Sequence, residues 1–389
     1  MAVLGIIAEY DPFHNGHMHH LREAVSLVSP SSVLVALSGP FKQRGEASLL
    51  SPFDRAACAL SAGADAVFAL PVCWTVRDAE HYALGAVHCL ASLGADRLAF
   101  GAETADLSLL RQTADLLEDP PAVFRNALHD ALAEGAGYPG AVSAAAGVCL
   151  PESRKVLDRP NNILAVCYLR AIRRLRLSME PVVIPRSGEY HAELVCPESP
   201  STSALRNALR RGAWQNALAA LPPVSFRAVR SAFLSGRVPD HGRFDSLLLA
   251  KLRAMAPEEA SHLPDCPEGL DRALAAAAAE CGSREELIAK LTSRRYPAAR
   301  ISRLCAYALL GITKEVLDNT PLPDRLLLLA LKKNPSLTGS WKNNSLQVLT
   351  VPEYLKAADP AEQEAWRLWV LASRLPASWP FTQKLITGC

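Results

Sequence analysis

Residues 3–17 set the architecture of the chain and read Val3-Leu4-Gly5-Ile6-Ile7-Ala8-Glu9-Tyr10-Asp11-Pro12-Phe13-His14-Asn15-Gly16-His17. The first six residues are a short apolar run bounded by turn formers, which is typical of a core strand in a parallel sheet. Asp11-Pro12 ends the run, and an apolar pattern with helical spacing begins near His17. The chain is therefore predicted to open as a strand, a tight turn and a helix.

Two histidines, His14 and His17, lie three residues apart at this turn, with Gly16 between them. Residues three apart share one face of a helix, and Gly16 has no side chain to keep a flat ring or a phosphate away from the backbone. The first helical turn also presents free N–H groups to an anion. We therefore predict an ATP site that cleaves between the α- and β-phosphates.

This motif resembles the HIGH signature of the nucleotidylyltransferase superfamily, which includes the class I aminoacyl-tRNA synthetases. The signature needs a preceding strand and a following helix, and both are predicted here. His20 lies three residues after His17 and could line the same face, or it could be a solvated helix residue. The same choice is open for His19.

Composition indicates a globular protein of two or three domains, which we expect in the cytoplasm. The 389 residues are 50% hydrophobic, and 41 Lys and Arg nearly balance 39 Asp and Glu, so a nucleic acid would have to bind a local basic patch. No apolar run reaches the length of a membrane span, and the first one is too short for a signal peptide. The 10 cysteines form no C-x-x-C pair, and we expect them as reduced core residues.

Strand and helix patterns alternate in the first half of the chain. Further apolar runs cover 32–37, 66–70, 97–100 and 181–184, and helical patterns such as 52–62 and 79–92 separate them. The alternation predicts an α/β fold with a Rossmann-like, doubly wound parallel sheet. Ligands bind beyond the carboxyl ends of such strands, which selects segments 9–17, 38–46, 101–103 and 186–191.

The second half is rich in Ala, Leu and Arg and shows no strand alternation. Helical patterns are predicted over 204–221, 244–255, 269–281, 284–291, 301–310, 325–333 and 361–373. We therefore divide the chain into an ATP-binding catalytic domain, residues 1–221, and a mostly helical domain, residues 222–389.

A second candidate motif is Ser201-Thr202-Ser203-Ala204-Leu205-Arg206. Hydroxyls and amides at a helix start can hold phosphate oxygens, and Arg206 would neutralise departing pyrophosphate. Alone, the motif also fits a plain helix cap followed by a solvated arginine. The His-x-Gly-His motif upstream favours the phosphate role.

Five segments occur in an order that resembles the tRNA(Met) cytidine acetate ligase family: GIIAEYDPFHNGH (5–17), SGPFKQRGE (38–46), FGAE (100–103), PNNIL (160–164) and STSALR (201–206). The resemblance is strong up to about residue 210 and weaker beyond it. It implies a ligase that uses acetate and ATP, through an acetyl-adenylate, to make N4-acetylcytidine at the wobble position of elongator tRNA(Met).

The resemblance also implies the site residues, with His14, His17 and Arg206 as the catalytic ones. The implied ATP site consists of Ile7, Ala8, Glu9, Tyr10, Asp11, Pro12, Phe13, His14, Asn15, Gly16, His17, Met18, His19, His20, Gly101, Asn161, Arg186, Ser201 and Ser203. Mg²⁺ is expected with ATP, but no dedicated metal site is expected in the chain. Asn161 could read a ribose or adenine edge or cap the next helix, and Asn162 cannot be distinguished from it.

Two groups of residues are candidates for tRNA contacts. Gln43 and Arg44 lie in the loop after the second strand, where a solvated turn is the alternative. A basic cluster with an aromatic suits an RNA backbone and a splayed base; its members are Arg294, Arg295, Tyr296, Arg300 and Arg303. The arginine run 170–176 is a further candidate, with a solvated helix face as its alternative. We expect no stable protein partner and no membrane contact.

Three features depart from the family pattern. Asp11 stands where relatives carry Asn, Pro52 stands where they commonly carry Lys, and the strand-like region near 326–331 fits the family poorly. Two other functions stay open: a nucleotidyltransferase that adenylylates a small phosphate-bearing metabolite, and a non-catalytic RNA-binding relative.

Overall fold

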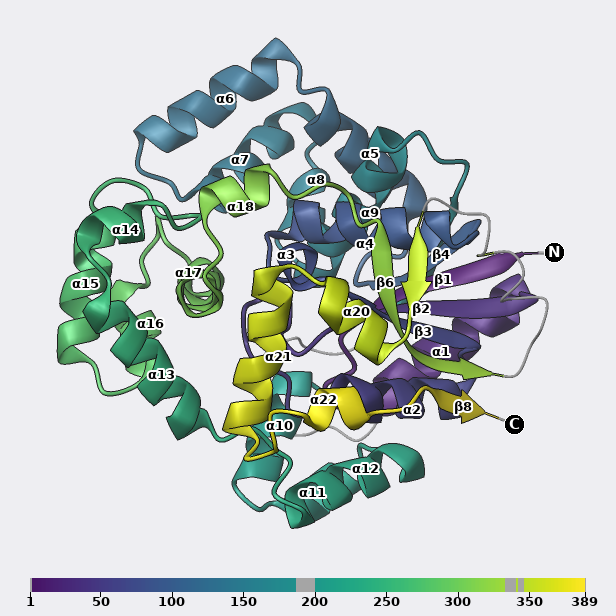
Figure 1. The fold of residues 1–389 in the computed structure, drawn as a ribbon. Coiled ribbons are helices and arrows are strands. Elements are labelled where there is room, and N and C mark those ends of the chain that lie inside the picture. Colours follow the sequence, from purple (N-terminus) through teal and green to yellow (C-terminus); the bar gives the residue numbers. More distant parts are fainter. Residues whose placement is uncertain (1, 187–199, 333–340, 342–345, 389) are drawn as a thin grey trace.

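An eight-stranded sheet forms the centre of the computed structural model, which describes residues 2–186, 200–332, 341 and 346–388 (Figure 1). The strands lie in the order β5-β4-β1-β2-β3-β6-β7, and β8 pairs with β6. The first five are mutually parallel: β1 (Val3–Ala8), β2 (Ser32–Ser38), β3 (Ala66–Leu70), β4 (Arg97–Ala102) and β5 (Glu180–Pro185). The predicted parallel α/β sheet is therefore confirmed.

Alternate residues of each parallel strand enter different cores on the two faces of the sheet. In β2, Val33 and Val35 pack in the core that contains Leu21 of α1 (Asn15–Val28) and residues of α2 (Pro52–Ala62). Leu34 and Ala36 point to the opposite core, which α4 (Ala79–Ser92) and α9 (Pro160–Arg174) cover. Helices on both faces confirm the doubly wound arrangement.

Short helices connect these elements and extend one side of the molecule. They are α3 (Val72–Thr75), α5 (Leu107–Glu118), α6 (Ala122–Ala133), α7 (Tyr138–Cys149) and α8 (Ser153–Leu157). Helices α6 and α7 form a pair with a small core of their own around Phe124, Ala145 and Ala146.

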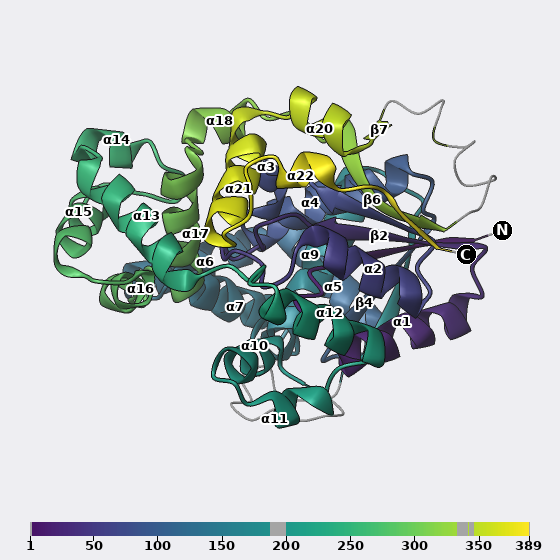
Figure 2. The ribbon, with the colours of Figure 1, turned by 60° about the horizontal axis from the view of Figure 1, so that its bottom comes forward.

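Helices dominate the chain from residue 200 onward (Figure 2). They are α10 (Thr202–Arg210), α11 (Trp214–Leu218), α12 (Pro223–Leu234), α13 (His241–Ala254), α14 (Pro257–Ser261), α15 (Leu270–Glu280), α16 (Arg284–Leu291), α17 (Ala298–Leu310), α18 (Lys314–Asp318), α20 (Val351–Ala357), α21 (Pro360–Ala372) and α22 (Trp379–Thr382). The helix predicted over 204–221 is broken, because Gly212 has a φ of +76°. Helices α13, α17 and α21 face the carboxyl ends of the parallel strands (Figure 1).

The helix predicted over 325–333 is wrong. Residues Arg325–Lys332 form β6, which pairs antiparallel with β3, while β7 (Gln347–Leu349) and β8 (Ile386–Gly388) pair parallel with β6. Leucine favours helices, but a short apolar run is ambiguous between helix and strand, and here the open edge of β3 determines the outcome. Strands therefore occur on both sides of the predicted domain boundary between residues 221 and 222.

The described cysteines carry free thiols, and all of them except Cys149 are buried. Cys196 and Cys389 lie outside the described residues, as does the predicted segment 187–191. Within the described ranges, no helix is both long and apolar enough to span a bilayer.

Candidate active site

His14 and His17 form a reciprocal cap at the start of α1. His14 Nδ1 accepts the backbone N–H of His17 at 3.4 Å, and His17 Nδ1 accepts the backbone N–H of His14 at 3.3 Å. The two rings stack with centroids 3.6 Å apart and planes 17° apart. Because both Nδ1 atoms are acceptors, each neutral ring carries its proton on Nε2. The cap therefore turns both Nε2–H donors away from the backbone of α1, and in this structure the one on His14 lies 3.2 Å from Thr202 Oγ1.

Both imidazoles are held neutral. Burial, and then the charge of Arg186, lowers the pKa of His14 to about 3. The same two causes lower the pKa of His20 to about 4. Burial together with the neighbouring His14 and Arg186 also keeps the pKa of His17 well below its ordinary value. At neutral pH these rings act as hydrogen-bond donors rather than as cations.

These depressed histidine pKa values predict a loss of stability in weak acid. Between pH 7.5 and 5.5 the unfolded chain takes up protons on these histidines, near a pKa of about 6.5, while the folded protein does not. The free energy of unfolding should therefore fall as the pH falls through 6.5, by up to about 1.4 kcal/mol per pH unit for each such group. Urea unfolding of the wild type and of His20→Asn at several pH values tests this, and equal slopes for the two proteins would contradict it.

Residues around the two histidines support the rings. Tyr10 and Phe13 are buried, and the Tyr10 ring lies 4.8 Å from Phe13 and 4.9 Å from His17. A Cβ atom on Gly16 would lie 3.1 Å from His14 Cε1, so this glycine makes room for the imidazole itself. The side chain of Asn15 donates to Ala219 O at 2.9 Å, which ties α1 to the segment after α11.

The remaining residues of segment 7–20 differ in their exposure. Ile7, Ala8 and Met18 are half-buried against the cores of the sheet, and Pro12 is buried. His19 is exposed, as its solvated alternative requires. His20 faces the site, because a Cβ atom on Gly101 would lie 3.7 Å from His20 Cδ2 and 3.9 Å from Arg186 Cδ. His20 Nε2 is buried and has no hydrogen-bond partner among the described residues.

The structure distinguishes Asn161 from Asn162. Asn162 is fully buried, and its side chain accepts from Thr104 N and donates to Thr104 Oγ1, both at 2.9 Å. Asn161 donates from Nδ2 to Glu103 at 2.6 Å and accepts from Arg186 Nη1 at 3.4 Å. Asn161 therefore faces the predicted ATP site, whereas Asn162 has a structural role.

Glu103 lies in the predicted ligand-binding segment 101–103, but no role was predicted for it. Its carboxylate accepts the backbone N–H groups of Asn161 at 3.4 Å and of Asn162 at 2.9 Å, so Glu103, and not Asn161, caps α9. A carboxylate at the end of a predicted strand, together with a proline that starts a later helix, was the available signal. Glu103 fixes the amide of Asn161 so that its oxygen points to Arg186.

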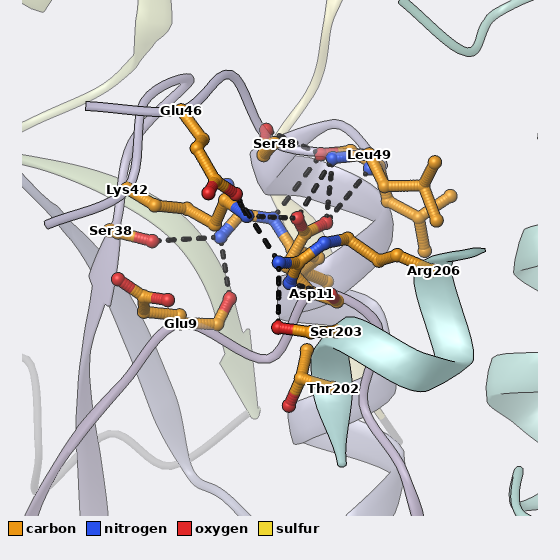
Figure 3. Close-up of polar contacts among 12 residues, drawn as sticks. Glu9, Asp11, Ser38, Lys42, Glu46, Ser48, Leu49, Thr202, Ser203 and Arg206 are labelled. Carbon is orange, nitrogen blue, oxygen red and sulfur yellow. Dashed lines mark hydrogen bonds and ion pairs between the residues drawn. The ribbon is translucent and has the colours of Figure 1, made fainter. Parts of the chain in front are cut away.

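Arg206 is buried and lies in a charge network with Lys42, Glu46 and Asp11 (Figure 3). Its guanidinium donates to Glu46 at 3.2 Å, to Asp11 O at 3.3 Å and to Ser203 Oγ at 3.4 Å. Glu46 also accepts from Lys42 Nζ at 2.6 Å. Lys42, followed by Arg206, lowers the pKa of Glu46 far below its ordinary value, although burial opposes this.

The Asp11 carboxylate makes its contacts with other residues of the protein. It accepts Leu49 N at 2.8 and 2.9 Å and Leu50 N at 3.1 Å, and Lys42 Nζ lies 3.6 Å away. Burial alone would raise the pKa of Asp11, but the positive charges of Lys42, Arg55 and Arg206 lower it. The negative charge of Asp11 is thus balanced by a buried lysine, and its side chain holds the backbone of residues 49 and 50.

Arg55 was also missed. It is fully buried and donates to Glu9 O at 2.6 Å, to Ser38 Oγ at 3.0 Å and to Leu50 O at 3.3 Å, so it ties together the ends of β1 and β2. An arginine within the apolar face of the predicted helix 52–62 was its only sequence signal. Pro52 occupies the first position of α2, where its missing N–H leaves no bond unmade.

The motif 201–206 contacts the histidines through Thr202, which lies between the two predicted phosphate ligands, Ser201 and Ser203. Thr202 Oγ1 lies 3.2 Å from His14 Nε2, and Ser203 Oγ accepts from Arg206. Ser201 is buried at the N-cap of α10. The structure therefore brings the two catalytic motifs together, and it adds Thr202 to the site.

The predicted tRNA residues fall into different environments. Gln43 donates its backbone N–H to Glu9 Oε1 and its side-chain Nε2 to Arg77 O, and Ser302 Oγ of α17 donates to Arg44 O. This loop is therefore packed against α17 and is not a solvated turn, although the Arg44 side chain is exposed. Arg300 and Arg303 bond Asp265. Arg294 and Arg295 are exposed.

The arginine run 170–176 is largely neutralised. Arg170 and Arg174 each pair with both Glu80 and Glu118, and Arg173 pairs with Asp115 and Asp119. As for metals, the part of the chain that the structure describes places no group of three or more His, Cys, Asp and Glu side chains where they could hold an ion.

Comparisons with known proteins agree with this geometry. Residues 1–384 match the family model described as HIGH Nucleotidyl Transferase. A tRNA(Met) cytidine acetate ligase from Acetivibrio thermocellus is 32% identical over 96% of this chain and 94% of its own length, and one from Kosmotoga olearia is 32% identical over 92% of this chain and 87% of its own.

Two crystal structures of Thermotoga maritima TmcAL, one apo and one bound with alpha-thio ATP, each superpose with a TM-score of 0.90 over 100% of this chain. They cover 99% and 100% of those chains, at 27% and 26% identity. Strand β6 therefore lies within the shared fold, contrary to the poor fit expected near 326–331. The chain belongs to the tRNA(Met) cytidine acetate ligase family of HIGH nucleotidyltransferases.

Proposed function

We propose that this chain activates acetate with ATP, as acetyl-adenylate, and transfers the acetyl group to N4 of the wobble cytidine of elongator tRNA(Met). The observation that carries the proposal is the reciprocal cap of two neutral imidazoles beside Thr202, with the charge of Arg186 acting on His14 and with Arg206 bonded to Ser203, the neighbour of Thr202. The names of the relatives, and the alpha-thio ATP bound to one of them, support the same reaction.

In the first step an acetate oxygen attacks the α-phosphorus of ATP, and the bond from that phosphorus to the bridging oxygen of the β-phosphate breaks. The Nε2–H groups of His14 and His17 donate to the α-phosphate more strongly as its charge builds up. Pyrophosphate leaves toward Arg206 and the hydroxyl groups of Ser201 and Ser203. Mg²⁺ enters as part of the ATP substrate.

In the second step the N4 amine attacks the acyl carbon, the bond from carbon to the AMP oxygen breaks, and N4 loses a proton. No protein side chain forms a covalent bond, so catalysis consists of positioning and electrostatics. The wobble cytidine must be unpaired and extruded to reach the site. Arg44 and the helical region 222–389 are proposed to bind the tRNA, and the cytoplasm is the proposed location.

Pyrophosphate exchange into ATP, measured with acetate, with other short acids and without acid, tests the first step. We expect exchange only with acetate. Exchange that needs no acetate would favour adenylylation of a metabolite, and no exchange at all together with tRNA binding would favour a non-catalytic RNA-binding protein. Transfer of labelled acetate to elongator but not initiator tRNA(Met) tests the second step.

A further inference from the structure

A surface hollow of about 410 Å³ lies between the start of α7 and the loop that leads into α17. It is lined by Ala136, Gly137, Pro139, Gly140, Arg294 and Pro297. The two walls come from distant parts of the sequence, and helices α7 and α17 both lie beyond the carboxyl ends of the parallel strands (Figures 1 and 2). The hollow is therefore on the side of the molecule where the proposed reaction takes place.

The two walls meet at backbone contact. A Cβ atom on Gly137 would lie only 2.1 Å from the carbonyl oxygen of Arg294, closer than any side chain allows. Gly137 thus permits α7 to begin directly against the Arg294 backbone. This contact holds the exposed Arg294 side chain next to the first turn of α7.

The charges around the hollow indicate which class of ligand it binds. Among the described residues, Arg294 and Arg295 form no ion pair, whereas Arg303 is paired with Asp265 and the arginines of α9 are paired with carboxylates. Two exposed guanidinium groups without a counter-ion in the described part of the chain favour an anionic ligand. A phosphodiester matches their planar donor pattern.

An aromatic residue adjoins the lining residues of each wall in the sequence. Tyr138, the first residue of α7, lies in the chain between the lining residues Gly137 and Pro139, and its side chain is 63% exposed. Beside the other wall, Tyr296 lies in the chain between Arg294 and Pro297, and Arg295 Cζ and Arg300 Cζ lie 5.6 Å and 5.3 Å from its ring centroid. An exposed ring beside free arginines is typical of surfaces that stack an unpaired base and hold its phosphate.

We propose that this hollow binds an unpaired segment of the tRNA substrate, with a base on Tyr138 and the adjacent phosphates on Arg294 and Arg295. The inference rests on the proposed function and deepens it, because it assigns the α6–α7 hairpin to RNA binding. The hairpin carries none of the motifs by which the family resemblance was drawn. Binding here would hold the tRNA while its cytidine enters the site.

The test separates tRNA binding from acetate activation. Tyr138→Ala in the full chain should raise KM for tRNA about tenfold or more, the range of one lost base stack, while exchange with acetate, which needs no tRNA, stays within twofold. Tyr138→Phe, which keeps the ring, should restore KM. Arg294→Ala should weaken tRNA binding and make its dependence on salt less steep.

Matched controls come from the other surfaces. Leu27→Ala truncates a 64% exposed side chain at the C-terminal end of α1, and Lys155→Ala removes an exposed lysine that is already paired with Glu152; both should leave KM for tRNA unchanged. Wild-type KM and salt dependence in Tyr138→Ala and Arg294→Ala would overturn the inference. If the wild type shows no acetate-dependent exchange, the proposed function is contradicted instead. Filter binding of tRNA to the wild type and the variants would then still test whether the hollow binds RNA.

Discussion

Alanine in place of His14 or His17 is expected to lower acetate-dependent ATP–pyrophosphate exchange about a hundredfold or more, the range for loss of a preorganised donor at the reacting phosphate. Each ring supplies one Nε2–H donor, and each also holds its partner through the reciprocal cap. The two single variants should therefore lose nearly as much as the double variant, because the pair acts as a unit.

Loss of the helix cap must be separated from loss of the donor. His14→Asn keeps a side chain that caps helices well but removes the imidazole Nε2–H, so its stability should approach that of the wild type while exchange stays low. His19→Ala, at an exposed position of the same helix, should retain full exchange. Wild-type exchange in His14→Asn would contradict the role of the ring.

Lys42→Met is expected to lower the free energy of unfolding by about 3–5 kcal/mol, the range for a buried carboxylate that loses its ion-pair partner. The Lys42 side chain is 3% exposed and lies 3.6 Å from the fully buried Asp11 carboxylate. Without Lys42, the charge of Asp11 is balanced only by the longer-range fields of Arg55 and Arg206. Urea denaturation at neutral pH measures the loss.

A double-mutant cycle shows whether the pair is the cause. Asp11→Asn introduces the residue expected from the family pattern and removes the unbalanced charge, so Asp11→Asn/Lys42→Met should be more stable than Lys42→Met alone. Lys155→Met, which breaks an exposed pair with Glu152, should change stability by less than about 1 kcal/mol. Additive effects at Asp11 and Lys42 would show that the two charges are independent.

The elements that could be predicted are those whose signal is local. Strands 3–8 and 66–70 and helices 52–62 and 79–92 have the predicted bounds, because apolar runs are bounded there by proline, glycine or capping residues. The leucine run of β6 carried no such local signal, since its partner β3 lies far away in the sequence.

In the site, sequence motifs identified the histidines, the hydroxyl motif and Arg206 but not the residues that hold them. Arg55 and Glu103 act on backbone groups of distant segments, and no spacing rule connects them to those groups. Asn161 and Asn162 are adjacent amides whose roles differ only because one side chain points to Thr104 and the other to Arg186. Such roles depend on tertiary contacts.

The antiparallel pairing of β6 with β3 has a consequence for biosynthesis. Until residues 325–332 leave the ribosome, the nascent chain carries β3 as an uncovered border, with backbone groups that another polypeptide can join. The indole N–H of Trp369 also reaches back 321 positions to Ser48 O, beside the clamp that Asp11 makes. The N-terminal half of the chain is thus synthesised long before β6 and Trp369, which complete its contacts. We expect the nascent chain to depend most on chaperones during that interval.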